Sequence, residues 1–389
     1  METEKLYYAD PFLTDFTATV LDCQPGKNGY LVTLDRTAFY PEGGGQPADH
    51  GVLDRAAVTD VHEKNGVILH NVDRAVEIGK TVTGTIDWGR RFDHMQQHSG
   101  EHICSGLICE RFHCDNVGFH MGADIVTIDF NADISWEELL EIEAKANQYL
   151  YENHPIDIQF HRGAELEAID YRSKKALEGD VRIVAFPGAD CCACCGTHVL
   201  RSGQVGLVKF LSVQKFREGV RIELLCGKRA LEYLSRTWEQ AKAIGQRLSV
   251  KPVDSEAAVE RLEGELASLK LRCAQLEESV FESMAKEQAG KGNVLLFQPA
   301  MRPDSVRRLM DAVSKTCCGL AAVFAGEEGH YAYALGRADG QDISPLVKAM
   351  NTALHGRGGG RNGFAKGSVE TERSAIESFF KENGYGICD

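Results

Sequence analysis

The 389-residue sequence has no apolar run long enough to span a bilayer and no N-terminal apolar segment of the signal-peptide kind. We therefore expect a soluble, cytoplasmic protein. Positive charge is also scarce. The chain has 43 Lys and Arg and 57 Asp and Glu, which gives a formal net charge of -14. This balance argues against non-specific binding of nucleic acid over the whole surface, although it is compatible with a local basic patch.

Disulfides are not expected, although the chain has 13 cysteines. Their number is odd, the chain is not small, and four of them crowd into Cys191, Cys192, Cys194 and Cys195, where adjacent thiols pair poorly. We interpret them as reduced thiols, one of which ligates a metal ion. The length allows two or three domains, each able to bury its own core.

Two short motifs predict a metal site. His98 and His102 lie in the run HSGEH, and Cys194 and His198 lie in the run CCGTH. Two imidazoles four residues apart share one face of a helix, and a Cys and a His four apart in a Gly-containing turn can converge on the same point. Together they offer ligands that suit one tetrahedral zinc ion.

Spacing alone leaves the choice of cysteine open, because Cys191 and Cys194 form a CxxC pair, as do Cys192 and Cys195. A metalloprotease is a poor match. Its HExxH motif places a Glu directly after the first His, whereas here Glu101 directly precedes the second.

The patterning predicts an α+β multidomain protein. Strand-like alternation and turns suggest a β-barrel-like domain, or a sandwich, in the first part, and the second mixes helix and strand around the metal motifs. The predicted domains are a β-barrel-like domain (1–88), a mixed α/β zinc-containing domain (89–227), a helical, coiled-coil hairpin stalk (228–290) and a C-terminal α/β domain (291–389).

Local signals place several elements of the first two domains. A capping box, Ser135 with Glu138, opens a helix that runs to about residue 151. Helical periodicity also covers 90–112, the segment with both motif histidines. Strands are predicted at 31–34, 82–88, 126–130, 181–186, 207–213 and 220–225.

The stalk has the a/d spacing of a coiled coil. Its seam consists of Val259, Leu262, Leu266, Leu269, Cys273, Leu276 and Val280. A preceding helix starts the same rhythm at Leu231, and Pro252 lies in the connection, so the two helices are expected to pack as an antiparallel hairpin. The alternative is one helix that dimerises through this seam.

The last domain is predicted to alternate strands at 294–297, 320–324 and 331–335 with helices after Asp304 and Ser344. A Gly-rich basic loop, GRGGGRNGFAKG, follows at 356–367. Its GxGxxG spacing follows a helix and not a strand, so it does not indicate a dinucleotide site. The candidate contacts to a tRNA phosphate backbone are Arg357, Gly358, Gly359, Gly360, Arg361 and Lys366. The alternative is a flexible surface loop.

A second Gly-rich stretch, FYPEGGGQP at 39–47, leads to no helix and is therefore not a phosphate loop. Its backbone could let a small substrate approach closely. The substrate-binding candidates are Gly43, Gly44, Gly45 and Gln46. A purely structural turn is the alternative.

Taken together, the motifs resemble a known family. FYPEGGGQPADHG, MQQHSGEH, CCGTHV followed by GQVG, and FREGVRIELL resemble successive motifs of the alanyl-tRNA synthetase editing domain and of its free-standing relatives, the AlaX proteins. The stalk and HGRGGGRNGFAKG resemble the C-terminal DHH-associated domain of the synthetase and of the long AlaX form. The resemblance covers nearly the whole chain.

This resemblance implies a zinc-dependent aminoacyl-tRNA deacylase. It would hydrolyse tRNA(Ala) wrongly loaded with serine, and also with glycine, in trans, with zinc on His98, His102, Cys194 and His198. No domain for amino-acid activation precedes the β domain, so no aminoacylation is expected. The partners would be mischarged tRNA(Ala) and a second copy, as a homodimer through the stalk or the C-terminal domain.

The motifs depart from the family in HSGEH, where HTAxH is usual, and in CCGTH, where CGGTH is usual. Four protein ligands leave a tetrahedral zinc no vacant position, so we expect zinc to position the substrate while water is activated nearby. The catalytic candidates are Glu101, Thr197 and His120, with Gln46 close to the ester. Two other classes stay open: a zinc hydrolase of a small ester or peptide, and a non-catalytic, zinc-containing tRNA-binding module.

Overall fold

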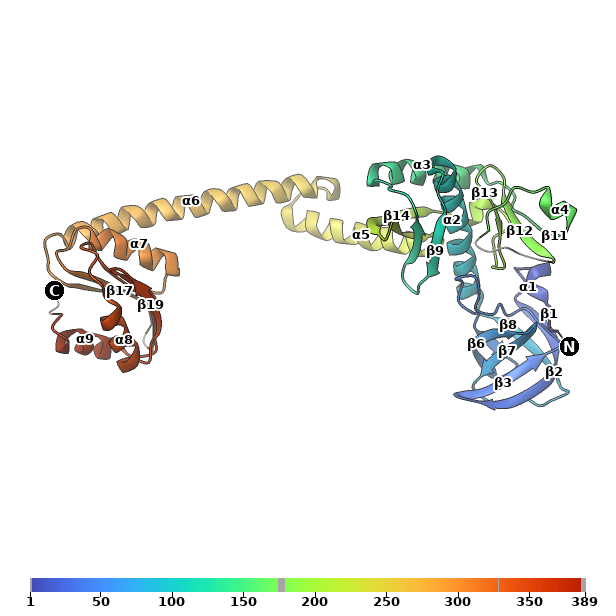
Figure 1. The fold of residues 1–389 in the computed structure, drawn as a ribbon, viewed down its shortest axis with the longest axis horizontal. Coiled ribbons are helices and arrows are strands. Elements are labelled where there is room, and N and C mark those ends of the chain that lie inside the picture. The colour runs from blue at the N-terminus through green and yellow to red at the C-terminus, as the bar shows by residue number, and fades with distance from the viewer. Residues whose placement is uncertain (1, 174–178, 328, 386–389) are drawn as a thin grey trace. The chain divides into compact units, whose positions relative to one another are not determined.

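The computed structural model describes residues 2–173, 179–327 and 329–385 (Figure 1). By their contacts these residues form two compact units, Met1–Ala243 and Ile244–Asp389. The first unit includes the predicted boundary at residue 88, and the division into four domains stays a prediction. In the described part of the chain no helix is both long enough and apolar enough to cross a membrane.

The N-terminal strands close into a barrel of order β2-β3-β7-β6-β5-β8. Its inward positions alternate with outward ones, as in β8 (Thr81–Ile86), where Val82, Gly84 and Ile86 are buried. The other barrel strands are β2 (Asp15–Gly26), β3 (Gly29–Leu34), β5 (Gly51–Leu53), β6 (Ala56–Lys64) and β7 (Val67–Val72). Beside the barrel lie β1 (Glu4–Lys5), α1 (Leu6–Ala9) and β4 (Arg36–Thr37).

A long helix, α2 (Trp88–Phe112), leaves the barrel and runs along an antiparallel sheet of order β14-β15-β10-β9 (Figure 1). Asp87 caps its N-terminus, because its side chain accepts a hydrogen bond from the Arg90 N–H. The sheet strands are β9 (Asn116–Met121), β10 (Val126–Phe130), β14 (Val208–Phe216) and β15 (Gly219–Cys226).

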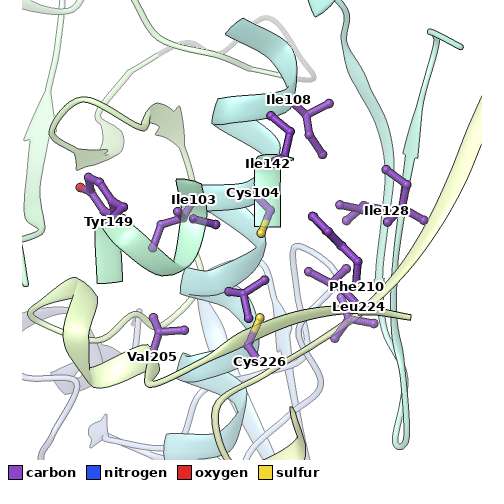
Figure 2. Close-up of a cluster of buried hydrophobic side chains, with 14 of the residues drawn as sticks. Ile103, Cys104, Ile108, Ile128, Ile142, Tyr149, Val205, Phe210, Leu224 and Cys226 are labelled. Carbon is purple, nitrogen blue, oxygen red and sulfur yellow. The ribbon is translucent and has the colours of Figure 1, made fainter. Parts of the chain in front are cut away.

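The core of this region lies between α2, α3 (Trp136–Glu152) and the sheet. Figure 2 shows Ile103 and Ile108 of α2 with Ile142 of α3, and Phe210 and Leu224 of the sheet in the same cluster. The capping box of Ser135 and Glu138 is confirmed at the start of α3. Burial of this apolar face stabilises the frame that holds the metal motifs.

A second, smaller sheet of order β11-β12-β13 carries the cysteine cluster. Its strands are β11 (Asp157–His161), β12 (Val181–Phe186) and β13 (Asp190–Ala193). The short helices nearby are α4 (Ala164–Glu167) and η1 (Ser202–Val205). Because β13 ends at Ala193, Cys194 and His198 lie in the following loop, close to α2.

The predicted stalk helices are present as α5 (Gly227–Leu248) and α6 (Ser255–Glu287), joined through η2 (Pro252–Asp254). On α6 the apolar seam side chains Val259, Leu262, Leu266, Leu269, Leu276 and Val280 are 41% to 60% exposed. These seam side chains are therefore not buried among the described residues, and the hairpin packing remains a prediction.

The second unit contains a five-stranded sheet of order β16-β17-β18-β20-β19. Its strands are β16 (Val294–Gln298), β17 (Leu320–Glu327), β18 (His330–Arg337), β19 (Arg357–Arg361) and β20 (Phe364–Val369). The helices of this unit that pack on the sheet are α7 (Pro303–Ser314), α8 (Ser344–Ala353) and α9 (Arg373–Glu382).

The prediction of a loop at 356–367 is wrong. Residues 357–361 form the edge strand β19, which pairs with β20 in antiparallel register. Asn362 and Gly363 connect the two strands with positive φ angles of 46° and 67°, which is the geometry that an Asn-Gly hairpin turn requires. The glycine content suggested a loop, whereas the Asn-Gly pair was the signal for a hairpin.

Candidate metal centre

The four predicted metal ligands converge. His98 and His102 lie one turn apart on α2, and Cys194 and His198 come from the loop after β13. Their ligand atoms all lie within 4.8 Å of one another. The Cys194 Sγ is 3.5 Å from the His98 Nε2 and 3.4 Å from the His198 Nε2.

These separations fit a tetrahedral zinc ion. With Zn–N and Zn–S bonds of about 2.1 and 2.3 Å, a nitrogen and a sulfur ligand lie about 3.6 Å apart. The donor set of three imidazoles and one thiolate also matches the preference of zinc for nitrogen and sulfur. The residues therefore fit the metal that the sequence motifs predict.

Each imidazole of the cluster is held at its other nitrogen. The Nδ1 of His98 lies 2.9 Å from Gln46 Oε1, that of His102 lies 2.8 Å from Asp190 Oδ2, and that of His198 lies 3.2 Å from Ser99 Oγ. With Nδ1 protonated, each ring presents an unprotonated Nε2 toward the centre. Such outer partners orient imidazole ligands in zinc sites.

The thiol of Cys194 lies among these imidazoles. Burial alone would raise the pKa of the thiol, but the neighbouring imidazoles of His98, His198 and His102 hold the pKa well below its usual range. The N–H of Gly196 also donates to the sulfur at 3.3 Å. A Cβ on Gly196 would lie 2.1 Å from the His98 ring, so this turn needs glycine to approach the helix.

A cavity of about 370 Å³ opens onto the cluster. Its walls come from the second sheet, from β9 and from the Gly-rich turn. The lining residues are Gly44, His98, Glu101, His102, Asn116, Phe119, Arg172, Ser173, Asp180, Val181, Arg182, Cys192, Ala193, Cys194 and Cys195. We call this space the cluster cavity.

Glu101 is the one predicted catalytic residue that lines the cluster cavity. Its side chain is almost fully buried, at 4% exposure. The Ser105 hydroxyl donates to Glu101 Oε1 at 2.6 Å, and the Asn116 Nδ2 donates to the same oxygen at 2.8 Å. These two donors fix the orientation of the carboxylate beside the ligands.

Thr197 and Gln46 lie behind the cluster and do not line the cavity. The Gln46 Nε2 donates to Thr197 Oγ1 at 2.8 Å, and Gln46 Oε1 accepts from the Thr197 N–H at 3.1 Å. Since the same oxygen faces His98, the carboxamide is fully engaged. This position suits orientation of a metal ligand, and not the contact with substrate that the sequence suggested.

His120 is also placed away from the cavity, which contradicts its interpretation as a substrate-facing residue. It lies on β9 directly after Phe119, whose ring stacks on His98 with centroids 5.2 Å apart. Successive residues of a strand point to opposite faces. Because Phe119 faces the cluster, His120 points away and is exposed.

The turn of Gly43 to Gln46 forms one wall of the cluster cavity. The N–H of Gly43 donates to the Gln46 carbonyl at 3.1 Å, and the Gln46 N–H donates to the Gly43 carbonyl at 3.0 Å. Gly44 and Gly45 have φ angles of +60° and +85°. A Cβ on Gly45 would lie 2.5 Å from the Phe119 ring, so glycine is needed there, and Gly44 is the member that reaches the cavity.

A buried ion pair ties this turn to α2. The Arg91 guanidinium binds the Asp49 carboxylate through Nε at 3.0 Å and through Nη2, with both side chains fully buried. Asp49 also accepts from the Tyr40 N–H at 2.6 Å, just before the Gly-rich turn. The pair therefore fixes the position of the turn relative to the helix that carries His98.

Four of the six predicted tRNA contacts share one face of the β19–β20 hairpin, and Gly358 and Gly360 lie on the other. Arg357, Gly359 and Arg361 alternate along β19, and Lys366 pairs directly opposite Gly359. Residues that alternate in a strand, and those that pair across strands, share a face. The three cations are exposed, and Gly358, Gly359 and Gly360 line a groove of about 310 Å³ beside α8.

Sequence reasoning missed the residues that complete the site. Asp190 bridges His102 and Arg172, which donates to it from Nε at 2.7 Å. Asn116 Oδ1 and Arg182 Nε are buried without a hydrogen-bond partner in the described part of the chain, although both residues line the cavity. No local sequence pattern predicts these residues, because each contacts partners that are distant in the sequence.

Comparison with known proteins shows which families two parts of the chain resemble. Residues 3–90 match the family "tRNA synthetases class II (A)", and residues 181–223 match the "Threonyl and Alanyl tRNA synthetase second additional domain". A solved structure, the C-Ala domain from Aquifex aeolicus alanyl-tRNA synthetase, covers 25% of this chain and 96% of its own, at 19% identity and a TM-score of 0.22.

Among curated relatives, the alanyl-tRNA editing protein AlaX-L of Pyrococcus horikoshii is 30% identical over 96% of both chains. The alanine–tRNA ligases of Natronomonas pharaonis and Pyrococcus abyssi are 37% and 32% identical over 73% and 98% of this chain. The chain spans 32% and 44% of the length of these two ligases. The chain belongs to the AlaX family of alanyl-tRNA editing proteins, which is homologous to part of the alanine–tRNA ligases.

Proposed function

We propose that the protein is a zinc-dependent aminoacyl-tRNA deacylase that hydrolyses tRNA(Ala) carrying serine or glycine. One observation carries this proposal: three imidazoles, each held at Nδ1 by a separate partner, surround the Cys194 thiol beside a cavity that contains Glu101. The name of the P. horikoshii relative, an alanyl-tRNA editing protein, supports the choice of substrate.

In the proposed site, His98, His102, Cys194 and His198 would hold the zinc ion. When bound, zinc supplies a positive charge that draws the ester end of the substrate into place. Four protein ligands fill a tetrahedral coordination shell. We therefore assign proton transfer to a side chain of the cavity.

Glu101 is the proposed general base. Ser105 and Asn116 hold its Oε1, which leaves Oε2 to accept a proton from a water molecule in the cavity. The oxygen of that water adds to the ester carbonyl carbon, and the bond to the ribose oxygen then breaks. Glu101 returns its proton to the ribose oxygen, so the products are the free amino acid and the tRNA.

Recognition of the amino acid is assigned to the two unpartnered polar groups of the cavity. Asn116 Oδ1 accepts and Arg182 Nε donates, and both are buried. A site built to hydrogen-bond a hydroxyl rejects an analogue that lacks it, since buried polar groups would stay unpaired. This pair would therefore favour serine over alanine.

The proposed contact to the tRNA backbone is the cationic face of the β19–β20 hairpin. Arg357, Arg361 and Lys366 supply positive charge there, in a chain whose net charge is -14. The edge strand β19 also presents glycine backbone amides, which can donate to phosphate oxygens. This local basic face is compatible with the acidic surface as a whole.

The deciding experiment follows release of the amino acid from Ser-tRNA(Ala), Gly-tRNA(Ala) and Ala-tRNA(Ala). We expect release from the first two and little from the third, with one zinc ion bound per chain. His98→Ala and Cys194→Ala should each lose zinc and activity. The matched controls His330→Ala and Cys191→Ala change an exposed imidazole and a thiol outside the ligand group, and should keep both.

The other outcomes identify the competing classes. Hydrolysis of a small serine ester without any dependence on tRNA would indicate a general zinc esterase. Tight binding of tRNA without release of amino acid would indicate a non-catalytic module. Full zinc content and full activity in both His98→Ala and Cys194→Ala would refute the assigned site.

A further inference from the structure

A second cavity, of about 460 Å³, has no role in the chemistry above. We call it the α2–α5 pocket, because the first turns of α2 and α5 form most of its wall. Gly89 and Arg90 come from α2, and Lys228 and Arg229 come from α5. Both helices therefore direct their N-termini, the positive ends of their dipoles, toward one space.

An unsatisfied polar atom points to a ligand in this pocket. His94, which lines it, is 2% exposed, and its Nδ1 has no hydrogen-bond partner among the described residues. Buried polar atoms of native proteins are almost always paired. A bound group that accepts a hydrogen bond would complete the pairing.

The charges around His94 favour an anion. Burial, together with the cations Arg90 and Arg229 and with His50 and Arg91, lowers the pKa of His94 to about 3. The ring is thus neutral and surrounded by positive potential. An anion could accept from its Nδ1–H and be attracted by the neighbouring cations.

The acidic residues of the pocket do not cancel this potential. Asp93 is already paired with Arg229, whose Nη2 lies 2.6 Å from its Oδ2. Glu232 lies 3.7 Å from Lys228 Nζ in an exposed pair, which contributes little. The Arg90 Nε donates to the Ala48 carbonyl, and among the described residues no carboxylate forms an ion pair with Arg90.

The pocket also lies at a suitable place along α2. His94 precedes His98 by four residues, so both share one face of the helix, about 6 Å apart along its axis. The Gly-rich turn borders both spaces, since Gly44 lines the cluster cavity and Pro47 lines the α2–α5 pocket. A ligand with an ester in the first space could therefore place a nearby anionic group in the second.

We propose that the α2–α5 pocket binds a backbone phosphate of the RNA 3′ strand whose terminal ribose carries the ester. This inference rests on the proposed function, because RNA is the substrate that joins such an ester to a phosphodiester. Arg90, Lys228 and the helix N-termini attract the phosphate, and His94 donates from Nδ1. The pocket is thus a positioning site that aligns the ester with Glu101.

The test uses unacylated RNA minihelices with the acceptor end of tRNA(Ala), and it measures their affinity for the full chain by fluorescence anisotropy. A neutral methylphosphonate replaces each of the last three 3′ linkages in turn. At one of them we expect a loss of affinity of about tenfold, typical of a lost charge-assisted hydrogen bond. Arg90→Gln should cause a similar loss with the natural linkage and no further loss with that methylphosphonate.

The control Arg55→Gln removes an exposed positive charge from the barrel. Because this site is independent of the pocket, its loss of RNA affinity should multiply with the loss caused by the methylphosphonate. Lys228→Gln, at an exposed position, repeats the test without disturbing the fold. The proposal is refuted if no methylphosphonate weakens binding to the natural protein. It is also refuted if the loss of affinity in Arg90→Gln and in Lys228→Gln multiplies with the loss caused by the methylphosphonate. Because the RNA is unacylated, the result does not depend on whether the protein hydrolyses the ester.

Discussion

The three imidazoles of the metal centre have three different outer partners: a carboxamide, a hydroxyl and a carboxylate. Of these three partners only the carboxylate of Asp190 brings a negative charge, and Arg172 holds that charge in place. A charged acceptor raises the basicity of the imidazole that it binds. Among the candidate ligands, His102 is therefore the one whose basicity depends most on a residue outside the ligand group.

We predict that Asp190→Asn lowers zinc affinity by about 10-fold to 100-fold while the fold is retained. Competition with a chromophoric chelator measures the change. The matched control is Asp129→Asn, which also breaks a carboxylate–arginine pair, with Arg221, but lies outside the ligand group. Unchanged zinc affinity in Asp190→Asn would show that His102 needs no charged partner.

A second prediction separates backbone strain from contact in the Gly-rich turn. Gly44→Ala meets no atom within 4 Å and should cost only the strain of a positive φ, about 1 kcal/mol. Gly45→Ala carries the same strain, and its Cβ also overlaps the Phe119 ring, so we expect a larger loss of thermal stability. Calorimetry of both variants, with zinc content as a second readout, makes the comparison.

At this scale the clustering of the four candidate ligands, with Glu101 beside them, was predictable because their spacing within HSGEH and CCGTH carries the information. Asp190, Asn116 and Arg182 were not predictable, because each partner lies far away in the sequence. Gln46 was predicted as a site residue, but with a different role. Its position in a Gly-rich turn suggested contact with substrate, whereas its carboxamide is occupied by His98 and Thr197.

Among the elements, the barrel contains a buried histidine with a fixed tautomer. The Nδ1 of His70 donates to the Val32 carbonyl at 3.0 Å, and its Nε2 lies 2.8 Å from Thr37 Oγ1. Burial lowers the pKa of His70 to about 4. The folded barrel therefore holds a neutral imidazole, which the unfolded chain protonates near pH 6.5.

We predict that the stability of the barrel falls as the pH drops from about 6.5 to about 4, because the unfolded state then binds the extra proton. At pH 5 the amide protection of β3 and β7 should be about 20-fold lower than at pH 7 from this group alone. Hydrogen exchange with mass spectrometry measures it. His70→Gln, which cannot titrate, should lose most of this pH dependence. If the variant and the natural protein show the same pH profile, groups other than His70 cause the loss of stability.

The β19–β20 hairpin gives a prediction on RNA binding. Arg357→Gln with Arg361→Gln should weaken binding of tRNA and lower the slope of log affinity against log salt by about 1 to 2, because two phosphate contacts are lost. The matched pair Lys315→Gln and Lys381→Gln removes two exposed lysines away from this face. If both double variants lower the slope of log affinity against log salt equally, the hairpin has no specific contact with RNA and only the total charge matters.

Capping and periodicity placed most helices and buried strands, as for α3 after Ser135 and α8 with Pro345 in its first turn. They missed β19, because an edge strand made mostly of glycine has no alternating apolar face. Tertiary pairing with β20 creates this strand, and local propensity does not. The Asn362-Gly363 turn was the available local signal.

For the whole molecule, the exposed seam of α6 predicts self-association. We expect a homodimer in solution, because six apolar side chains spaced as a coiled-coil seam are 41% to 60% exposed. Light scattering after gel filtration should report about twice the mass of the chain, and Leu262→Glu with Leu269→Glu should return it to a monomer. An unchanged monomer mass in the natural protein would exclude this association.

Cys273 provides an independent test of whether the two helices of such a dimer are parallel. It occupies the seam and is exposed, so a parallel dimer in register would bring the two Cys273 thiols together. Mild oxidation should then give a covalent dimer that Cys273→Ser abolishes. The exposed Cys318 lies outside the seam, so Cys318→Ser should leave the product unchanged.

The bond network of Gln46 has a consequence for how such proteins can evolve. Gln46 follows the first strands of the barrel, yet its side chain orients a ligand on α2 and the turn before His198. Recombination that exchanged the barrel for an unrelated domain would therefore remove part of the metal site. The barrel and the cysteine-containing sheet should be inherited together, and gene fusions that preserve function should have their junctions outside residues 1–243.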